Sequence, residues 1–399
     1  MVSGSGSTII SPKITTASQI LTNSDRTYRN ISIRIDLASI RHNLKCVKAL
    51  APSSKVIAVV KADAYGHGML RVLPALQDAD AFAVATIDEG IALRRSGETK
   101  PVMVLHGFRT ASQMYDCIAH NLWPVIHDRY QLEFIADKSL ANLSCWIKFD
   151  TGMSRTGLRV ENAPSIHRRL AAASVDVVGI MSHLANADNV KDISNDRQLR
   201  QFNSIKWPDE VDKSLANSAA TASRNDLQFD WVRPGILLYG ASPFEHVSAQ
   251  ALGLQPAMRV TAPVISIRDV KRGQRIGYGS RFQCEKNMKV AVIGAGYGDG
   301  YPRSVPDGTS VMLGNQRCPL VGRISMDSMI VDISALTVPP PIDYPVTLWG
   351  HGRLPVDEIA ARSDTIPYEL LCCIRGQRQW IDATSEVNIR KFDKDLTIN

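Results

Sequence analysis

The chain has 399 residues, more than twice the length of a typical single domain, so two domains are expected. Hydrophobic residues make up 44% and charged residues 21% of the sequence, which excludes a wholly disordered, collagen-like or disulfide-scaffold protein. Lys and Arg outnumber Asp and Glu by 46 to 39. Because this surplus is spread along the chain, it suits anionic small molecules better than nucleic acid.

The cysteines and the N-terminus point to an intracellular protein. Seven cysteines, without a zinc-type double pair, indicate neither a disulfide framework nor a metal site, and a reducing compartment is expected. Residues 1–30 are rich in Ser and Thr and lack the apolar core of a secretory signal, so we interpret them as a mobile extension, with a transit peptide as the alternative. No run approaches the roughly 20 apolar residues that span a bilayer, and a soluble, cytoplasmic protein is predicted.

The first predicted element is a helix that begins after Asp36. The Asp36 side chain is a suitable N-cap, and Leu37, Ile40, Leu44 and Val47 follow at helical spacing.

Short apolar runs then alternate with helical patterns, and we interpret them as eight strands: Val56–Val60, Ala81–Ala85, Val102–Leu105, Trp123–Ile126, Cys145–Phe149, Val177–Met181, Ser214–Ala216 and Ile236–Tyr239. Such alternation favours parallel strands with right-handed crossovers. Eight units predict an α/β fold that starts with a (β/α)8 TIM-type barrel over residues 31–252. The alternative is an open doubly wound sheet, which is disfavoured because no G-x-G-x-x-G turn follows an early strand.

After residue 252 the pattern changes to strands separated by Gly and Pro turns. The predicted strands are Val260–Ile267, Lys289–Ile293, Thr309–Leu313, Met329–Ile333 and Pro345–Leu348. Residues 253–399 are therefore predicted to form a mainly β second domain.

The ends of the barrel strands carry the candidate chemistry, because such barrels place reactive groups at the carboxyl ends of their strands. Lys61 ends the first run, and desolvation there would lower its pKa and make it a Schiff-base nucleophile; a lysine that extends into water is the alternative. Ser218 follows the seventh run, and the amides of Gly235 and Ile236 can face a phosphate. A Schiff-base lysine opposite a phosphate cradle is what pyridoxal phosphate requires.

Nine segments between about Ser32 and about Leu371 strengthen this interpretation: V-V-K-A-D-A-Y-G-H-G, I-K-F-D-T-G-M-S-R-T-G, S-H-L-A-N-A-D, A-N-S-A-A-T, V-R-P-G-I-L-L-Y-G, G-Y-G-S, G-Y-G-D-G-Y-P-R, V-G-R-I-S-M-D and P-Y-E-L. In this order they closely resemble bacterial alanine racemases, the fold-type III pyridoxal-phosphate enzymes. The resemblance implies that Lys61 binds the cofactor as a Schiff base and is one catalytic base, and that Tyr278 is the other. Two bases are needed because inversion of a carbon requires a proton to leave one face and return to the opposite one.

The resemblance also implies a homodimer with two shared sites, because in this family the second base comes from the partner subunit. For Tyr278, a turn tyrosine that packs on the edge of the β domain is the alternative. The backbone amide of Met326 from the partner is expected to meet the substrate carboxylate, and Tyr297 and Arg303 are expected at the entrance. A narrow entrance favours alanine, with serine next.

Further roles around the cofactor follow from the same resemblance. Arg233 is expected at the pyridine nitrogen, where a guanidinium that keeps its proton makes the ring a weaker electron sink and so favours simple proton return. His183 is expected to join the network between Arg233 and Tyr278. Arg155 is expected to meet the cofactor's phenolic oxygen and the substrate carboxylate, and Lys148 matches a lysine that is often carbamylated in relatives. The remaining cofactor contacts are expected from Tyr65, Asn217, Ser218, Gly235, Ile236 and Tyr368.

Three positions and one C-terminal segment depart from the family pattern. Asp63 replaces the usual asparagine, and its charge could raise the pKa of Lys61 or face solvent. Gly298 and Ser325 are milder changes within their motifs, and the segment from Cys372 onward does not follow the usual ending.

The predicted activity is interconversion of L- and D-alanine, for peptidoglycan or for catabolism. A fold-type III amino-acid decarboxylase and a racemase of broad specificity for small amino acids are the enzyme alternatives. A pyridoxal-phosphate carrier keeps only the barrel, and the residues after Leu252 argue against it.

Overall fold

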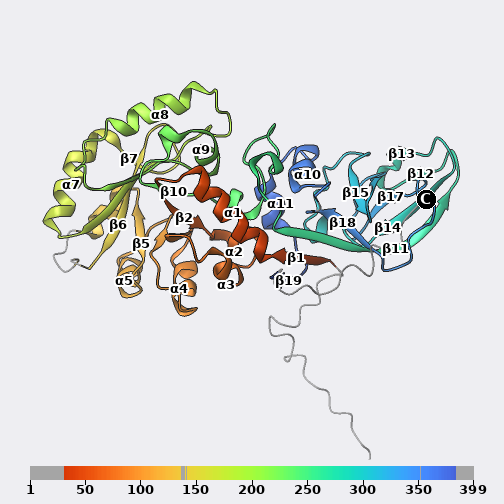
Figure 1. Cartoon of the computed structure of the whole chain (residues 1–399), viewed down its shortest axis with the longest axis horizontal. Coiled ribbons are helices and arrows are strands. Elements are labelled where there is room, and N and C mark those ends of the chain that lie inside the picture. The colour runs from red at the N-terminus through yellow and green to blue at the C-terminus, as the bar shows by residue number, and fades with distance from the viewer. Residues whose placement is uncertain (1–30, 136–139, 141, 351, 383–399) are drawn as a thin grey trace, which may run out of the picture.

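The computed structural model describes residues 31–382 except 136–139, 141 and 351; the predicted extension 1–30 lies outside the described residues. Two parts are visible, a barrel surrounded by helices and a β-rich domain at the other end of the molecule (Figure 1). Within the described part of the chain, no helix is both long and apolar enough to cross a membrane.

Eight parallel strands form a closed barrel, as predicted. The ring contains β2 (Lys55–Val59), β3 (Ala81–Val84), β4 (Val102–Val104), β5 (Trp123–Ile126), β6 (Ser144–Asp150), β8 (Asp176–Met181), β9 (Asp212–Ser214) and β10 (Trp231–Val232). It closes because β10 pairs in parallel with β2. This closure excludes the open doubly wound sheet. The short β7 (Leu158–Arg159) adds to β6 outside the ring.

Helices follow the strands and cover the barrel. They are α1 (Leu37–Leu50), α2 (Lys61–Tyr65), α3 (Met69–Val72), α4 (Ile87–Arg95), α5 (Ala111–Ala119), α6 (Arg129–Phe134), α7 (Ala163–Ala172), α8 (Ile193–Asn203) and α9 (Ser218–Ser223). Asp36 caps α1 as predicted, since its carboxylate accepts hydrogen bonds from the amides of Ala38 and Ser39. Ile40, Leu44 and Val47 of this helix are buried.

The predicted eighth strand, Ile236–Tyr239, is wrong: this run is a 3-10 turn, and β10 is the eighth strand. Pro234 lacks an N–H for a strand ladder, and Gly240 ends the turn in the left-handed conformation. The apolar run is buried because α1 packs against it, with Asn43 donating a hydrogen bond to the Leu238 carbonyl at 3.2 Å. Burial of a short apolar run therefore did not distinguish a strand from a turn.

The second domain is mainly β, as predicted. Its strands are β11 (Met258–Val270), β12 (Arg275–Ile276), β13 (Phe282–Gln283), β14 (Met288–Ile293), β15 (Ser310–Leu313), β16 (Gln316–Pro319), β17 (Met329–Asp332), β18 (Pro345–Trp349) and β19 (Gln377–Ile381). The long β11 pairs with β14 and β18. Two helices, α10 (Val356–Arg362) and α11 (Pro367–Cys373), lie between this domain and the barrel (Figure 1).

The first described strand, β1 (Ser32–Asp36), belongs to the second sheet. It pairs antiparallel with β11 and parallel with β19, and it leads directly into α1. No sequence pattern predicted this strand. Because β1 continues into α1, the chain passes between the second sheet and the barrel twice, once at Asp36 and again between β10 and β11.

Candidate active site

A cavity of about 630 Å³ opens at the carboxyl ends of the barrel strands. Most of the predicted site residues line it: Lys61, Tyr65, Lys148, Arg155, His183, Asn217, Ser218, Arg233, Gly235 and Tyr368. They lie on or just after five barrel strands, β2, β6, β8, β9 and β10, except Tyr368, which α11 of the second domain supplies. The barrel topology thus collects side chains that are up to about 300 residues apart in sequence.

The element α2 (Lys61–Tyr65) is a single turn of left-handed rather than right-handed conformation, and it follows β2 after one residue, Val60. Ala62, Asp63, Ala64 and Tyr65 all have positive φ, between 53° and 55°, so four consecutive residues other than glycine are left-handed. Such residues cost roughly 1–2 kcal/mol each. The turn aims the Lys61 side chain into the cavity, where burial and the nearby charge of Arg155 lower its pKa.

Two carboxylates hold the backbone of this turn. Asp63 accepts a hydrogen bond from the Met69 amide at 2.7 Å, and Glu89 accepts one from the Ala62 amide at 2.8 Å. The carboxylate that raises the pKa of Lys61, against burial, is Glu89. Asp63 is exposed, and its carboxylate holds the turn by accepting the Met69 amide. Of the two alternatives for this residue, the solvent-facing one therefore applies.

Tyr65, Ser218 and Gly235 form a tight polar corner at one end of the cavity. The Ser218 hydroxyl accepts a hydrogen bond from the Gly235 amide at 2.8 Å. A side chain at Gly235 would place its Cβ 2.2 Å from the Tyr65 hydroxyl, so only glycine fits there. The Tyr65 ring lies 4.9 Å from that of Tyr239 and 5.9 Å from that of Tyr368. Asn217 caps α9 beside this corner, whereas Ile236 is buried and does not line the cavity.

Arg233 is almost fully buried directly after β10, two residues before Gly235. Its guanidinium donates to the Ser214 hydroxyl and, at 2.6 Å, to the Ser182 carbonyl. These bonds fix the orientation of a cation that keeps its proton. Burial and the charge of Arg233 hold the pKa of His183 well below its ordinary value, so His183 is neutral.

Lys148 lines the cavity close to Arg155. Its ammonium donates a hydrogen bond to the Thr156 hydroxyl at 2.7 Å. Burial, followed by the charges of Arg155 and Arg233, lowers the pKa of Lys148 to about 8. Together with Lys61, four cationic side chains line the cavity, and none of the described lining residues is a carboxylate. The donor set suits a ligand that carries phosphate and carboxylate groups.

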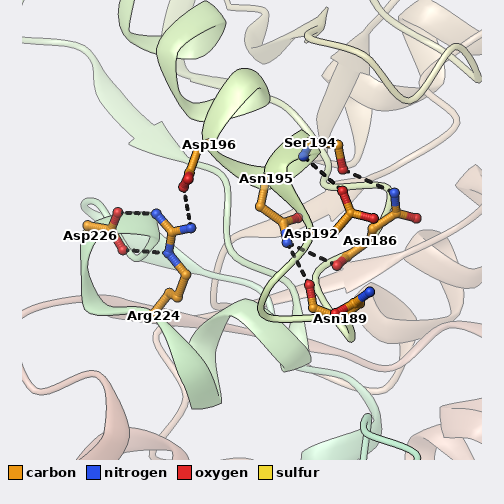
Figure 2. A network of polar contacts seen from close by, with 8 residues as sticks. All are labelled: Asn186, Asn189, Asp192, Ser194, Asn195, Asp196, Arg224 and Asp226. Carbon is orange, nitrogen blue, oxygen red and sulfur yellow. Dashed lines mark hydrogen bonds and ion pairs between the residues drawn. The ribbon is translucent and has the colours of Figure 1, made fainter.

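The loop that follows His183 is held by α8. The side-chain amide of Asn195 donates hydrogen bonds to the backbone carbonyls of Asn186 and Asn189, both at 3.0 Å (Figure 2). One turn further, Gln198 donates to the His183 carbonyl at 2.9 Å. The position of His183 is therefore fixed through its backbone.

The same helix is tied to the segment after α9 by an ion-pair group. Arg224 donates to Asp226 at 3.0 Å and to Asp196 at 2.5 Å, so that one guanidinium joins two elements (Figure 2). This group lies away from the cavity and supports the loop indirectly.

The predicted second base and entrance residues do not line this cavity. Tyr278, Met326 and Tyr297 lie on the second domain, where 69%, 50% and 39% of each is exposed, and Arg303 is exposed as well. Two of their segments lie together, since the Tyr297 amide donates to the Ser325 carbonyl at 3.1 Å and the Gly298 amide to the Met326 carbonyl at 2.9 Å. A single protomer therefore does not bring Tyr278 into the cavity of Lys61.

Four polar residues of this site were not predicted from the sequence. His106, Thr156 and Cys372 line the cavity, and Glu89 braces the Lys61 turn. His106 directly follows a predicted strand, so its place at a carboxyl end was a usable signal. Cys372 lies four residues after Tyr368 on α11, which puts both on one helix face.

A closed (β/α)8 barrel with a desolvated lysine in a cationic cavity, followed by a β domain, is the architecture of a class of two-domain barrel enzymes. Residues 35–243 match the family described as alanine racemase, N-terminal domain, and residues 257–380 match alanine racemase, C-terminal domain. The chain belongs to the alanine racemase family.

Individual relatives agree with this assignment. The chain is 46% identical over 349 residues to an alanine racemase of Thioalkalivibrio sulfidiphilus, which covers 86% of this chain and 96% of the relative. Among solved structures, the biosynthetic alanine racemase of Pseudomonas aeruginosa superposes with a TM-score of 0.84 at 38% identity, over 89% of this chain and all of the other. The alanine racemase of Bartonella henselae, described with covalently bound pyridoxal phosphate, gives 0.79 at 29% identity over 88% and 99%.

Proposed function

We propose that this protein interconverts L-alanine and D-alanine with pyridoxal 5'-phosphate as its cofactor. The observation that carries the proposal is the position of Lys61, desolvated at the end of β2 in a cavity whose described lining has four cations and no carboxylate. A neutral lysine amine is the nucleophile that a cofactor aldehyde requires. When bound, the cofactor supplies an electron sink for the charge that develops on the substrate carbon.

The residues present fit this group. The corner of Tyr65, Ser218 and Gly235, closed by Tyr368 and backed by Ile236, would hold the phosphate, and Asn217 would orient the adjacent helix. Arg233 would face the ring nitrogen, with its guanidinium already fixed by Ser182 and Ser214. Arg155 would meet the phenolic oxygen and the substrate carboxylate, and neutral His183 would contact the ring.

The proposal includes a homodimer in which each cavity is completed by the partner. Lys61 moves the proton on one face of the substrate carbon, and a Tyr278 hydroxyl moves it on the other. The support is the exposure of Tyr278, Met326 and Tyr297 on one domain, away from the cavity of their own protomer. In this arrangement the Met326 amide would meet the substrate carboxylate, and Tyr297 and Arg303 would line the entrance. Residues 31–252 would then supply most of the cofactor site, to which Tyr368 of the same chain adds one side chain, and residues 253–399 would also complete the partner's site.

Carbamylation of Lys148 is also proposed. A pKa of about 8 leaves a substantial neutral fraction, whose nitrogen can attack carbon dioxide with loss of one proton. The product is an anion beside Arg155 and Arg233, where an ammonium would repel both. The modification therefore replaces repulsion among three cations with attraction between the carbamate and the two arginines.

A cytoplasmic protein that provides D-alanine for peptidoglycan, or consumes it in catabolism, completes the proposal. All seven cysteines are free thiols, which agrees with a reducing compartment.

The test is incubation of the purified protein and cofactor with L-alanine in deuterated water, followed by chiral analysis. We expect both enantiomers with deuterium at the α-carbon, and no activity in Lys61→Ala. Parallel incubations with L-serine and L-lysine, with detection of released carbon dioxide, test the broad-specificity racemase and the decarboxylase. Release of carbon dioxide from L-lysine without racemisation of alanine would contradict the proposal.

A further inference from the structure

We infer that strand β19 acts on the cofactor site of its own protomer: Arg378 and Trp380 are positioning residues that keep the Lys61 turn in its left-handed conformation. The inference rests on the proposed role of Lys61 and Tyr65 in binding the cofactor. It assigns a second role to the β domain, separate from the completion of the partner's cavity.

The turn needs support from outside. Its four consecutive left-handed residues other than glycine are each unfavourable relative to the ordinary right-handed conformation. The turn closes its own backbone bonds, from the Ala64 amide to the Val60 carbonyl at 2.8 Å and from the Gly66 amide to the Ala62 carbonyl at 3.0 Å. A right-handed turn of the same residues would make equivalent bonds without the cost. The contacts that select the left-handed form must therefore come from elsewhere.

Two consecutive carbonyls at the end of the turn accept hydrogen bonds from β19. The Arg378 guanidinium donates through Nε to the Gly66 carbonyl at 2.8 Å, and the Trp380 indole donates to the His67 carbonyl at 2.7 Å. These donors alternate along one strand and so point to the same side of the sheet. Carbonyls turned in another direction would lose both partners.

The shape of the contact is equally specific. A Cβ at Gly68 would lie 2.7 Å from the Trp380 ring, and a Cβ at Gly66 would lie 2.2 Å from the Leu371 carbonyl. The Arg71 guanidinium lies 5.4 Å from the centre of the Trp380 ring, which adds a cation–π contact from the segment after the turn. The second domain thus lies directly against the back of the turn.

The supporting strand is itself anchored. β19 pairs in parallel with β1 over its whole length, and β1 continues into α1, which packs on the barrel. Movement of β19 away from the turn would therefore break its pairing with β1.

Loss of this support is expected to weaken the binding of pyridoxal phosphate. If only a fraction of the cofactor-free molecules keeps the turn in its left-handed form, the apparent dissociation constant for pyridoxal phosphate rises by the inverse of that fraction. A hydrogen bond contributes about 0.5–1.5 kcal/mol, so loss of either donor is expected to weaken cofactor binding by about two- to tenfold.

The test compares full-length Trp380→Phe and Arg378→Gln with wild type in two measurements. The first is hydrogen exchange of the peptide spanning residues 60–68 in the cofactor-free protein, and the second is titration with pyridoxal phosphate, followed by the visible absorbance of the lysine-bound form. Trp380→Phe keeps the ring and removes only the donor. Arg41→Gln is the matched control, because it breaks the ion pair with Asp382 at the end of the same strand without touching the turn.

We expect faster exchange confined to this peptide and a two- to tenfold weaker cofactor affinity in both variants, with neither change in Arg41→Gln. Arg378→Lys, which keeps a donor, should recover part of the affinity. Unchanged exchange at residues 60–68 would overturn the inference, as would faster exchange spread over the whole protein. Failure of the wild type to take up the cofactor would instead contradict the proposed function, while the exchange data would still decide the inference.

Discussion

The amide of Ala62, next to the candidate catalytic lysine, donates a hydrogen bond to Glu89 Oε1 at 2.8 Å. The other oxygen of the same carboxylate accepts from the amides of Ala85 and Thr86, at 2.8 and 3.0 Å. One carboxylate therefore joins the end of β2 to the end of β3 and also caps α4. Its negative charge acts on Lys61 in the direction opposite to burial.

Replacement of Glu89 with Gln is expected to destabilise the protein and to lower the pKa of Lys61. The amide keeps one acceptor but turns an NH2 group toward backbone amides that already donate, which should cost about 1–3 kcal/mol and reduce the melting temperature. The pKa of Lys61 should fall further because the charge that raises it is gone. Calorimetry and an NMR pH titration of the lysine side chains measure the two effects.

Glu161→Gln is the control for this prediction. Glu161 is a surface residue whose side chain is 68% exposed and lies 3.6 Å from Arg159, so its replacement should change stability by less than about 0.5 kcal/mol. Equal melting temperatures for the Glu89 and Glu161 variants would contradict the bracing role of Glu89.

The barrel could be predicted because its pattern is local. Each strand is a short apolar run with a helix after it, and seven of the eight predicted runs overlap barrel strands, although Ser214–Ala216 shares only Ser214 with β9. The eighth failed at Ile236–Tyr239, where burial against α1 produces the same run of apolar letters as a strand. β1 was missed for a related reason: its partners β11 and β19 are more than 200 residues away, and no local turn signal marks its pairing.

The residues of the site could be predicted from the sequence, but the backbone conformation that positions Lys61 could not. Lys61 and Ser218 were found because barrel chemistry lies at strand ends. The left-handed turn was not, since Ala62–Tyr65 contains no glycine and its conformation depends on Trp380, over 300 positions away. Glu89 had a readable signal in the capping pattern Thr86-x-x-Glu89, but the bond to Ala62 is a tertiary contact.

Mixing two inactive variants should restore activity if each cavity uses a tyrosine from the partner. In a mixed dimer of Lys61→Ala and Tyr278→Phe, one cavity has both altered residues and the other has neither. Random exchange of equal amounts makes half of the dimers mixed, so about a quarter of the wild-type activity should return. The measurement is the rate of racemisation after the two proteins have exchanged subunits.

Each variant alone, treated in the same way, is the control and should remain inactive. If Tyr278 served the cavity of its own chain, every cavity in the mixture would lack one residue and no activity would return. Substantial racemase activity of Tyr278→Phe alone would remove the tyrosine from the mechanism.

Lys148 should make stability depend on pH. Its pKa is about 8 in the folded protein and 10.5 when unfolded, so between these values the unfolded chain binds more protons and the folded state gains stability as pH rises. Below pH 8 the unfavourable burial of the cation costs on the order of 3 kcal/mol. Lys148→Met should therefore melt at a higher temperature than the wild type at pH 7 in carbon-dioxide-free buffer.

The difference between the two proteins should shrink toward pH 10.5, and a constant difference would contradict the low pKa. Addition of bicarbonate at pH 8 should stabilise the wild type but not Lys148→Met, because only the wild type can form the carbamate. A ¹³C signal from labelled bicarbonate that is present in both proteins would place the carbamate on another amine.

Gly235→Ala should weaken cofactor binding without unfolding the barrel. The new Cβ would lie 2.2 Å from the Tyr65 hydroxyl and 2.8 Å from the ring carbon that bears it. The Tyr65 ring must therefore move, either toward Tyr239 or into the space proposed for the phosphate. Overpacking of this kind costs about 1–3 kcal/mol, which corresponds to a dissociation constant for pyridoxal phosphate raised by about five- to 150-fold. Gly352→Ala, where a Cβ meets nothing within 4 Å, is the control and should bind normally.

Because the clash and the proposed phosphate contact share the Tyr65 hydroxyl, Gly235→Ala combined with Tyr65→Phe should lose less affinity than the two single losses added together. Strict additivity would show that Gly235 acts on the cofactor by some route other than Tyr65.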